Sequence, residues 1–105
     1  MVVLAIFDVY ITDEDEYERY KAMVRKSLKI YDAKFVTITN EGDNNLEVLE
    51  GNWKPSHLVI LEFKTKEHAK TWYYSSEYAE ALEIRKKASK TNFILVETFS
   101  HDTLM

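Results

Sequence analysis

The chain has 105 residues, which suits one domain with one core over residues 1–105 and leaves no room for two. It contains no cysteine, which excludes disulfides, thiolate metal sites and cysteine nucleophiles and favours a reducing, cytoplasmic location. The formal net charge of -4 comes from interspersed acids and bases, which disfavours nucleic-acid binding, and the longest apolar run, residues 2–7, is too short for a membrane span or a signal peptide.

The first two predicted elements are a strand over residues 2–11 and a helix over residues 12–31. Alternate residues of the strand form one wholly apolar face, whereas the other face starts apolar and becomes polar at Asp8 and Tyr10. Thr12 precedes four consecutive acids, which suits the positive end of a helix dipole. Aromatic and aliphatic residues then recur at helical spacing, so we expect one face of this helix to be buried.

The middle of the chain predicts two more strands. Residues 34–39 are rich in β-branched residues, and residues 40–45 form a turn cluster of asparagine, aspartate and glycine. Residues 46–49 could add a small extra strand. Residues 57–63 alternate with a period of two, which predicts the third main strand.

The last third predicts a broken helix and a final strand. Thr65 can cap a second helix, and Ser75 or Ser76 interrupts and recaps it. Residues 93–99 then form the final strand. The resulting order, βαββαβ, predicts an α+β ferredoxin-like fold, with a four-stranded antiparallel sheet in the spatial order 4-1-3-2 and helices on one face.

The sheet face without helices is predicted to be apolar. It would present Leu4 and Ile6 together with either Leu58 and Ile60 or Val59 and Leu61. Because two-fold dimers are the commonest oligomers, we expect a second copy of the chain to cover this face. The predicted assembly is a homodimer, a dimeric α+β barrel, with a lined cavity between its two sheets.

Several motifs resemble one known family over nearly the whole chain. They are Glu50-Gly51-Asn52-Trp53-Lys54-Pro55, Glu62-Phe63, Ala69, Trp72-Tyr73, Ser75, Tyr78, Arg85 and Leu95-Val96-Glu97. This pattern is similar to the domain-of-unknown-function 1330 family, whose members are dimeric α+β barrels. The resemblance implies the same fold and the same homodimer, and it implies no reaction. Where that family tends to have arginines, this chain has Ile38-Thr39-Asn40 and His57.

Asp8 and Glu62 are the candidate catalytic residues. Both lie near the C-terminal ends of the first and third strands. We take these strands as parallel neighbours, so we expect the two carboxylates to lie close together. Two adjacent carboxylates favour retaining one proton, which suits a general acid or base. The alternative is structural, with each acid neutralised by Arg85, Lys34 or His57 or reaching solvent.

Seven residues are candidates for ligand binding: Tyr10, Glu50, Trp53, His57, Trp72, Tyr78 and Arg85. Trp53 follows a glycine and could be a lid over a pocket or a plug in the barrel mouth. Glu50 could instead fix its loop, and Trp72 and Tyr78 lie in an aromatic stripe that is typical of a core. For Arg85, a buried ion pair with a carboxylate is the main alternative to ligand contact.

No metal or cofactor is expected. His57, His68 and His101 lack metal-ligand spacing, and no phosphate-binding glycine loop or nucleophile motif is present. Two functions remain open: an enzyme of the cofactor-independent oxygenase or isomerase type with a small apolar substrate, or a non-catalytic ligand-binding or stress-related accessory dimer whose acids are structural. Haem binding through His57 or His68 is a third, more distant alternative.

Overall fold

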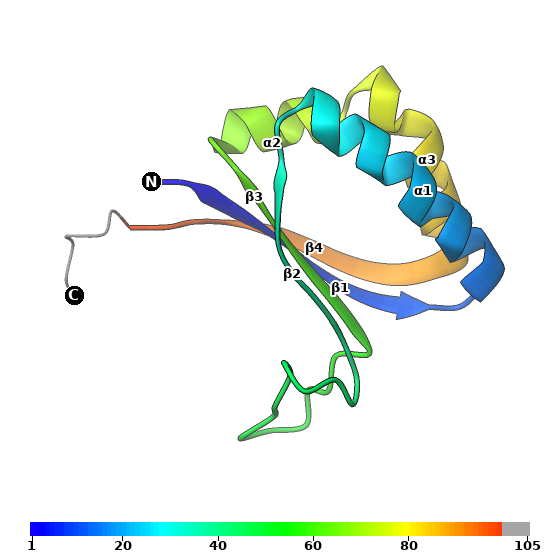
Figure 1. Cartoon of the computed structure of the whole chain (residues 1–105), viewed down its shortest axis with the longest axis vertical. Helices are drawn as coiled ribbons and strands as arrows, with labels where there is room; N and C mark the ends of the chain where they lie inside the picture. The colour runs from blue at the N-terminus through cyan, green and yellow to red at the C-terminus, as the bar shows by residue number, and fades with distance from the viewer. Residues whose placement is uncertain (100–105) are drawn as a thin grey trace.

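Four strands and three helices alternate along residues 1–99, the part of the chain that the computed structural model describes (Figure 1). In chain order they are β1 (Val3–Ile11), α1 (Glu14–Ile30), β2 (Lys34–Asn40), β3 (His57–Phe63), α2 (Lys66–Tyr73), α3 (Ser76–Ala88) and β4 (Ser89–Glu97). The order matches the predicted βαββαβ pattern, with the second helix divided at Ser75.

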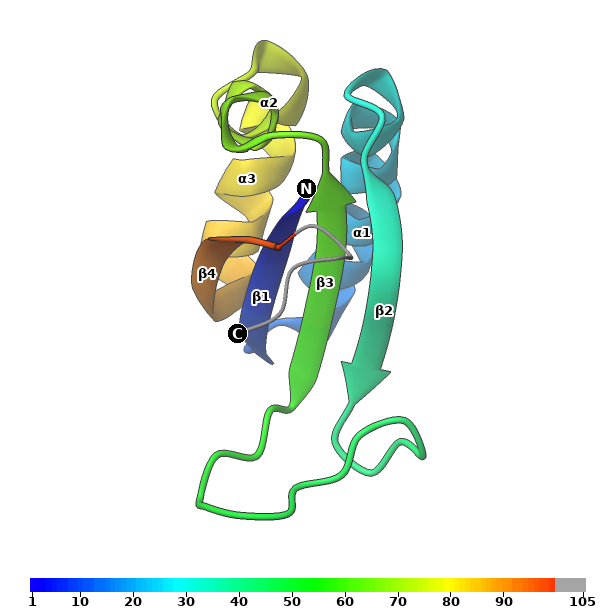
Figure 2. The ribbon, with the colours of Figure 1, turned by 90° about the vertical axis from the view of Figure 1, so that its left-hand side faces the viewer.

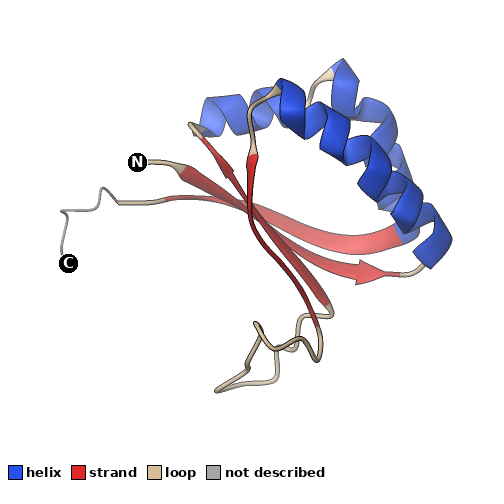
Figure 3. Cartoon of the chain, in the orientation of Figure 1, coloured by secondary structure: helices blue, strands red, loops and turns tan. Residues whose placement is uncertain are grey.

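The strands form one sheet in the order β2-β3-β1-β4, and every neighbouring pair is antiparallel. All three helices lie on the same face of this sheet, and the opposite face carries no helix (Figure 3). The α+β ferredoxin-like fold and the strand order expected from the sequence are therefore confirmed.

Each helix begins at a side chain that caps its first turn. Asp13, not Thr12, caps α1 by accepting a hydrogen bond from the Glu16 amide. Thr65 caps α2 and Ser75 caps α3, as the sequence predicts. The prediction for α1 was displaced by one residue because Thr12 and Asp13 are both good cap residues and only the backbone path selects between them.

Two segments, the final strand and residues 46–49, differ most from the prediction. β4 begins at Ser89, four residues earlier than expected, because β1 pairs with it continuously from Ile11↔Ser89 onward and holds a polar segment in strand conformation. Residues 46–49 form no strand. Their segment is part of an irregular connection over residues 41–56, where Leu49 is almost fully exposed and has no partner strand.

The helix-facing side of the sheet forms the core. Alternate β1 residues point into it, and Phe7 stacks on Phe93 of β4 with ring centroids 4.1 Å apart. Trp72 of α2 is fully buried between Phe63 and Tyr78. Aromatic rings thus join the sheet to both α2 and α3.

The other side of the sheet, which we call the open face, carries a continuous apolar patch. The register places Ile6 between Ile60 and Ile94, and Leu4 beside Val96. Of the two predicted alternatives, Leu58 and Ile60 face this side, whereas Val59 and Leu61 face the helices.

Strand β2 is an edge strand with a bulge. Phe35 pairs with Leu61 and Thr37 with Ile60, so Val36 is an extra residue in the ladder. β2 then leads into the connection over residues 41–56, which extends beyond the end of the sheet (Figure 2).

Candidate functional site

The two predicted catalytic acids do not meet. Since β1 and β3 are antiparallel, Asp8 lies opposite Leu58 and Glu62 lies opposite Leu4. Four residues of β3 separate those two levels, a spacing of about 13 Å along the strand. The expectation of adjacent carboxylates was wrong because it treated β1 and β3 as parallel. Both acids lie on the open face, and neither can share a proton with the other.

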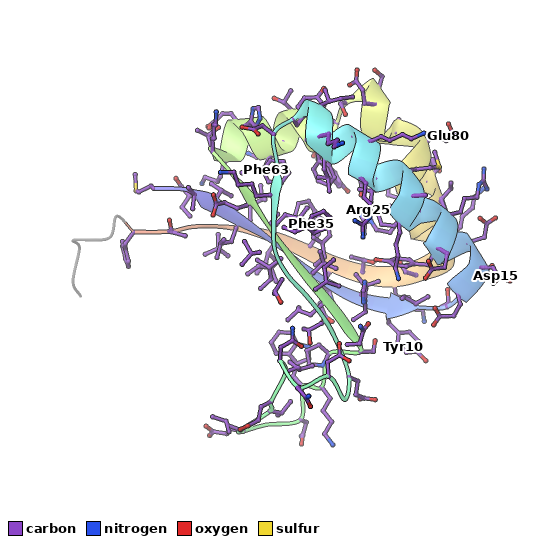
Figure 4. The ribbon with its side chains drawn as sticks, in the orientation of Figure 1. Tyr10, Asp15, Arg25, Phe35, Phe63 and Glu80 are labelled. Atoms are coloured by element: carbon purple, nitrogen blue, oxygen red, sulfur yellow. The ribbon has the colours of Figure 1, made fainter. Side chains whose placement is uncertain are left out.

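Asp8 is engaged by the loop tryptophan. The Trp53 indole Nε1 donates a hydrogen bond to Asp8 Oδ2 at 3.2 Å, which brings the 41–56 connection back to β1. Trp53 remains 61% exposed, Tyr10 is also exposed at the end of β1 (Figure 4), and Glu50 is exposed in the loop. The contact joins the 41–56 connection to β1 at Asp8.

A small apolar cavity lies on the helix side, between α1 and the sheet. We call it the α1 cavity, and its volume is about 160 Å³. Figure 4 shows Arg25 of α1 and Phe35 of β2 at one side of this space, with the guanidinium 5.5 Å from the ring centre. The lining residues are Phe7, Tyr17, Tyr20, Lys21, Val24, Arg25, Leu28, Phe35, Ile38, His57, Val59 and Leu61.

His57 is the titratable side chain of the sheet that lines the α1 cavity. It begins β3, is 5% exposed, and its Nδ1 lies 2.8 Å from Asn40 Oδ1. An amide oxygen can only accept, so this contact assigns the proton to Nδ1 and leaves Nε2 as the basic nitrogen. Burial, assisted by the positive charge of Lys21, lowers the pKa of His57, so the ring is neutral at pH 7.

Tyr17 packs its ring edge-on against His57, with centroids 5.4 Å apart. Within residues 1–99, neither the Tyr17 hydroxyl nor His57 Nε2 has a hydrogen-bond partner, yet neither atom is sealed from solvent. Burial raises the pKa of Tyr17 and keeps its hydroxyl protonated. The cavity therefore offers one acceptor and one hydroxyl in apolar surroundings.

A buried polar chain runs from this cavity into the core. Tyr20 and Tyr78 share a hydrogen bond of 2.9 Å between their hydroxyls, and Arg85 Nε donates to the Tyr78 hydroxyl at 3.3 Å. Burial raises the pKa of both tyrosines. Trp72 is core as well, and its Nε1 donates to Ser27 Oγ. The aromatic stripe read as core from the sequence is core in the structure.

Arg85 does not have the carboxylate partner that the sequence suggested. Its guanidinium lies over the Phe7 ring at 5.6 Å, and no acid within the described part of the chain comes within 4 Å of it. The apolar spacing on α3 placed Arg85 correctly on the buried face, but spacing alone carries no information about its partner.

Sequence reasoning identified His57 and missed the residues around it. Tyr17 and Tyr20 belonged only to the helix-face aromatics, and Asn40 belonged to the turn cluster and to the stretch that departs from the family pattern. The pairing Asn40↔His57 at the end of β2 and β3 is the signal that could have joined them, since cross-strand partners become clear once the hairpin register is known.

The described residues contain neither a cluster of metal-binding side chains nor a helix that could span a membrane. Across residues 1–99, no three His, Asp or Glu side chains gather closely enough to hold a metal ion. His68 Nε2 contacts the Tyr31 carbonyl oxygen, and His101 lies outside the described residues. No helix of residues 1–99 is both long and apolar enough to cross a bilayer.

Several solved structures share this fold. A protein of unknown function from Rhodopseudomonas palustris is 14% identical, with a TM-score of 0.72 over 94% of this chain and 83% of that one. A candidate antibiotic biosynthesis monooxygenase from Nitrosomonas europaea is 13% identical, with a TM-score of 0.60 over 95% and 92%. A cofactor-independent oxygenase from Streptomyces nogalater is 11% identical, with a TM-score of 0.53 over 96% and 94%.

No curated protein gives a significant sequence match. The model of one family, described as a domain of unknown function, matches residues 2–99, which is almost the whole chain. With the predicted fold and motifs in place, the chain belongs to the domain-of-unknown-function 1330 family.

Proposed function

We propose that the protein is a homodimer that binds a small, mostly apolar aromatic molecule in the α1 cavity of each chain, with His57 as hydrogen-bond acceptor and general base. The observation that carries this proposal is a neutral, buried imidazole on the wall of a cavity that is lined mainly by aliphatic and aromatic side chains. Ligand sites typically combine apolar walls with a few placed polar groups, and this cavity has that composition.

The volume of the cavity limits the size of the ligand. A volume of about 160 Å³ resembles that of engineered apolar cavities, on the order of 150 Å³, that hold benzene. Phe7, Phe35 and Tyr17 supply the aromatic part of the wall. A single ring with one hydroxyl fits both the volume and the polar groups.

His57 suits proton removal from such a hydroxyl. The ligand oxygen would give its proton to Nε2, forming an imidazolium and a ligand anion, while Nδ1 keeps its hydrogen bond to Asn40. Lys21 also lines the cavity and would stabilise the anion. The base is already deprotonated at neutral pH because its pKa is lowered.

The open face supports the proposed homodimer. Leu4, Ile6, Leu58 and Ile60 are only half-buried there, while Ile94 and Val96 are exposed. A second copy of the same face would remove this apolar surface from water. The expected chamber between two sheets stays a prediction, whereas the α1 cavity lies within one chain.

A second candidate function is binding without chemistry. The separation of Asp8 from Glu62 and the Trp53–Asp8 hydrogen bond favour structural roles for the acids. The likeness to oxygenases at 11–13% identity concerns the fold alone. Whether His57 transfers a proton decides between the two candidates.

Binding can be tested by titrating isotope-labelled protein with phenol and with toluene and following amide signals by NMR. We expect phenol to shift signals of α1 and β3 around the cavity and to bind more tightly than toluene. His57→Gln should remove the preference for phenol, while the matched change His68→Gln, outside the cavity, should keep it. Equal binding of both compounds to the unmodified protein would contradict the proposal.

Proton transfer can be tested with 4-nitrophenol, whose ionised form absorbs visible light. Binding to the unmodified protein should increase the ionised fraction at pH 7, and His57→Gln should abolish the increase. Binding with no change in ionisation would instead support the non-catalytic candidate.

A further inference from the structure

A second, larger cavity lies at the other end of the helix layer, between α2, α3 and β4. We call it the α3 cavity, and its volume is about 480 Å³. Its walls are formed by Ala69, Lys70, Tyr73, Tyr74, Arg85, Lys86, Ser89, Thr91, Phe93 and Leu95. None of these residues lines the α1 cavity, so the two cavities are separate.

The charges around the α3 cavity have one sign. Lys70, Arg85 and Lys86 contribute cations, and no aspartate or glutamate of residues 1–99 lines it. The chain as a whole has a net charge of -4, so this cluster of basic residues is contrary to the overall balance. Hydroxyl groups of Ser89 and Thr91 lie on the same wall.

Arg85 is the unusual member of this set. It is only 4% exposed, and within residues 1–99 its guanidinium makes one hydrogen bond, from Nε to the Tyr78 hydroxyl. Burying a cation without an anion costs free energy, and arginines this deeply buried are usually paired with a carboxylate. The terminal nitrogens are not sealed from solvent, since no buried side-chain donor among the described residues lacks a partner. They therefore remain available for a ligand.

We propose that the α3 cavity binds a small organic anion, with a carboxylate group on Arg85 and an apolar body against Phe93 and Leu95. The planar guanidinium fork matches a carboxylate through two parallel hydrogen bonds. Lys70 and Lys86, both exposed at the cavity, add charge around the same anion. The bound carboxylate supplies the negative charge that no acidic side chain of residues 1–99 provides to Arg85.

The walls favour an organic acid over a bare inorganic anion. Phe93, Leu95 and Ala69 form an apolar side that a phosphate ion would leave unused. A cavity of about 480 Å³ also lies within the usual range for small-molecule sites, about 300–1,000 Å³.

The probe is phenylacetate, and its uncharged analogue phenylacetamide is the matched comparison. We expect phenylacetate to shift amide signals of α2, α3 and β4 and to bind at least about tenfold more tightly than phenylacetamide, as the loss of a charge-assisted hydrogen bond implies. Equal affinity of the two compounds, or no binding of phenylacetate at millimolar concentration, would overturn the proposal.

Variants locate the site. The double change Lys70→Gln/Lys86→Gln affects exposed side chains and should weaken phenylacetate binding while the chain stays folded. Lys87→Gln is the control, because Lys87 is the exposed neighbour of Lys86 on α3 and does not line the cavity. Arg85→Gln should abolish the preference for the anion, with retained β-sheet signals showing that it folds. If Lys87→Gln weakens binding as much as the double change, the anion is held by general surface charge and the proposal is wrong.

This inference does not depend on the function proposed for the α1 cavity. Phenol binding is tested through His57, and phenylacetate binding is tested through Lys70, Lys86 and Arg85. Each set of signals can change without the other.

Discussion

The two faces of the sheet differ in more than their covering. Under the helices, apolar side chains surround three polar side chains that could hydrogen-bond a ligand: His57, Tyr17 and Arg85. These side chains line two cavities on the helix side of the sheet. On the open face, Asp8 and Glu62 lie at opposite ends of an aliphatic patch, and neither of them lines a cavity. The difference teaches that two acids in neighbouring strands can share a face and still lie far apart, whereas polar side chains on the buried face of the sheet reach the walls of cavities.

The largest expected effect is a loss of folding stability, which we compare between a tryptophan of the buried core and a tryptophan that contacts the open face. Trp72 is fully buried and hydrogen-bonded, so Trp72→Ala should lower the free energy of unfolding by about 3–5 kcal/mol. Trp53 is 61% exposed and makes one surface hydrogen bond, so Trp53→Ala should cost less than about 1 kcal/mol. Urea unfolding of both variants measures the contrast. Equal losses of stability in the two variants would mean that the loop contributes as much to folding as the core does.

The next effect concerns the open face alone. Ile60→Glu places a charge at the centre of the aliphatic patch and should weaken self-association by on the order of 100-fold, about 2.7 kcal/mol. Light scattering or sedimentation at micromolar concentration should show a monomer for the variant and a dimer for the unmodified chain. Lys90→Glu, at the polar margin of the same face, is the control. A monomeric unmodified protein would refute the dimer directly.

A smaller effect is expected in the buried polar chain. Tyr78→Phe leaves the Tyr20 hydroxyl and Arg85 Nε without their common partner and should cost about 1–3 kcal/mol. Tyr10→Phe on the open face removes an exposed hydroxyl and should be nearly neutral. Thermal unfolding of the pair provides the measurement, and a neutral Tyr78→Phe would show that water replaces the lost hydroxyl.

His57 should make the folding stability of the protein depend on pH. Its pKa in the folded state lies below the ordinary value of 6.5, so the unfolded chain binds a proton more readily. The stability that this group contributes is present above pH 6.5 and is lost as the pH falls below that value. An NMR titration of the imidazole should reveal the lowered pKa, and Lys21→Gln should raise it because a neighbouring positive charge is removed. An unchanged pKa in Lys21→Gln would leave burial as the whole cause.

The smallest expected effect is an increase in folding stability. Asp32 follows α1 with φ of 53°, and the amides of Asp32 and Ala33 close the helix on the carbonyls of Lys29 and Leu28. Asp32→Gly should stabilise the chain by about 0.5–1 kcal/mol, since glycine adopts this conformation without strain. Its exposed ion pair with Lys64 contributes little. A loss of stability on chemical denaturation would mean that this ion pair matters more than the backbone.

The fold was predictable because its signals are local. Alternation marked β1 and β3, and Thr65 and Ser75 identified two helix starts. The candidate site was only partly predictable. The pairing of Asn40 with His57 depends on the hairpin register. The lack of an acid beside Arg85 among the first 99 residues depends on three elements meeting in space. Neither fact has a signature in residue spacing, and assuming parallel strands misplaced Asp8 relative to Glu62.

The bulge at Val36 has a consequence for solubility. β2 borders the sheet, and its unpaired backbone groups, beside the exposed Phe35, Val36 and Ile38, could template the addition of strands from other chains. An extra residue bends the strand and interrupts the regular spacing that an incoming strand must match. We therefore expect the bulge at Val36 to disfavour fibre-like aggregation through this edge, and deletion of Val36 to favour it.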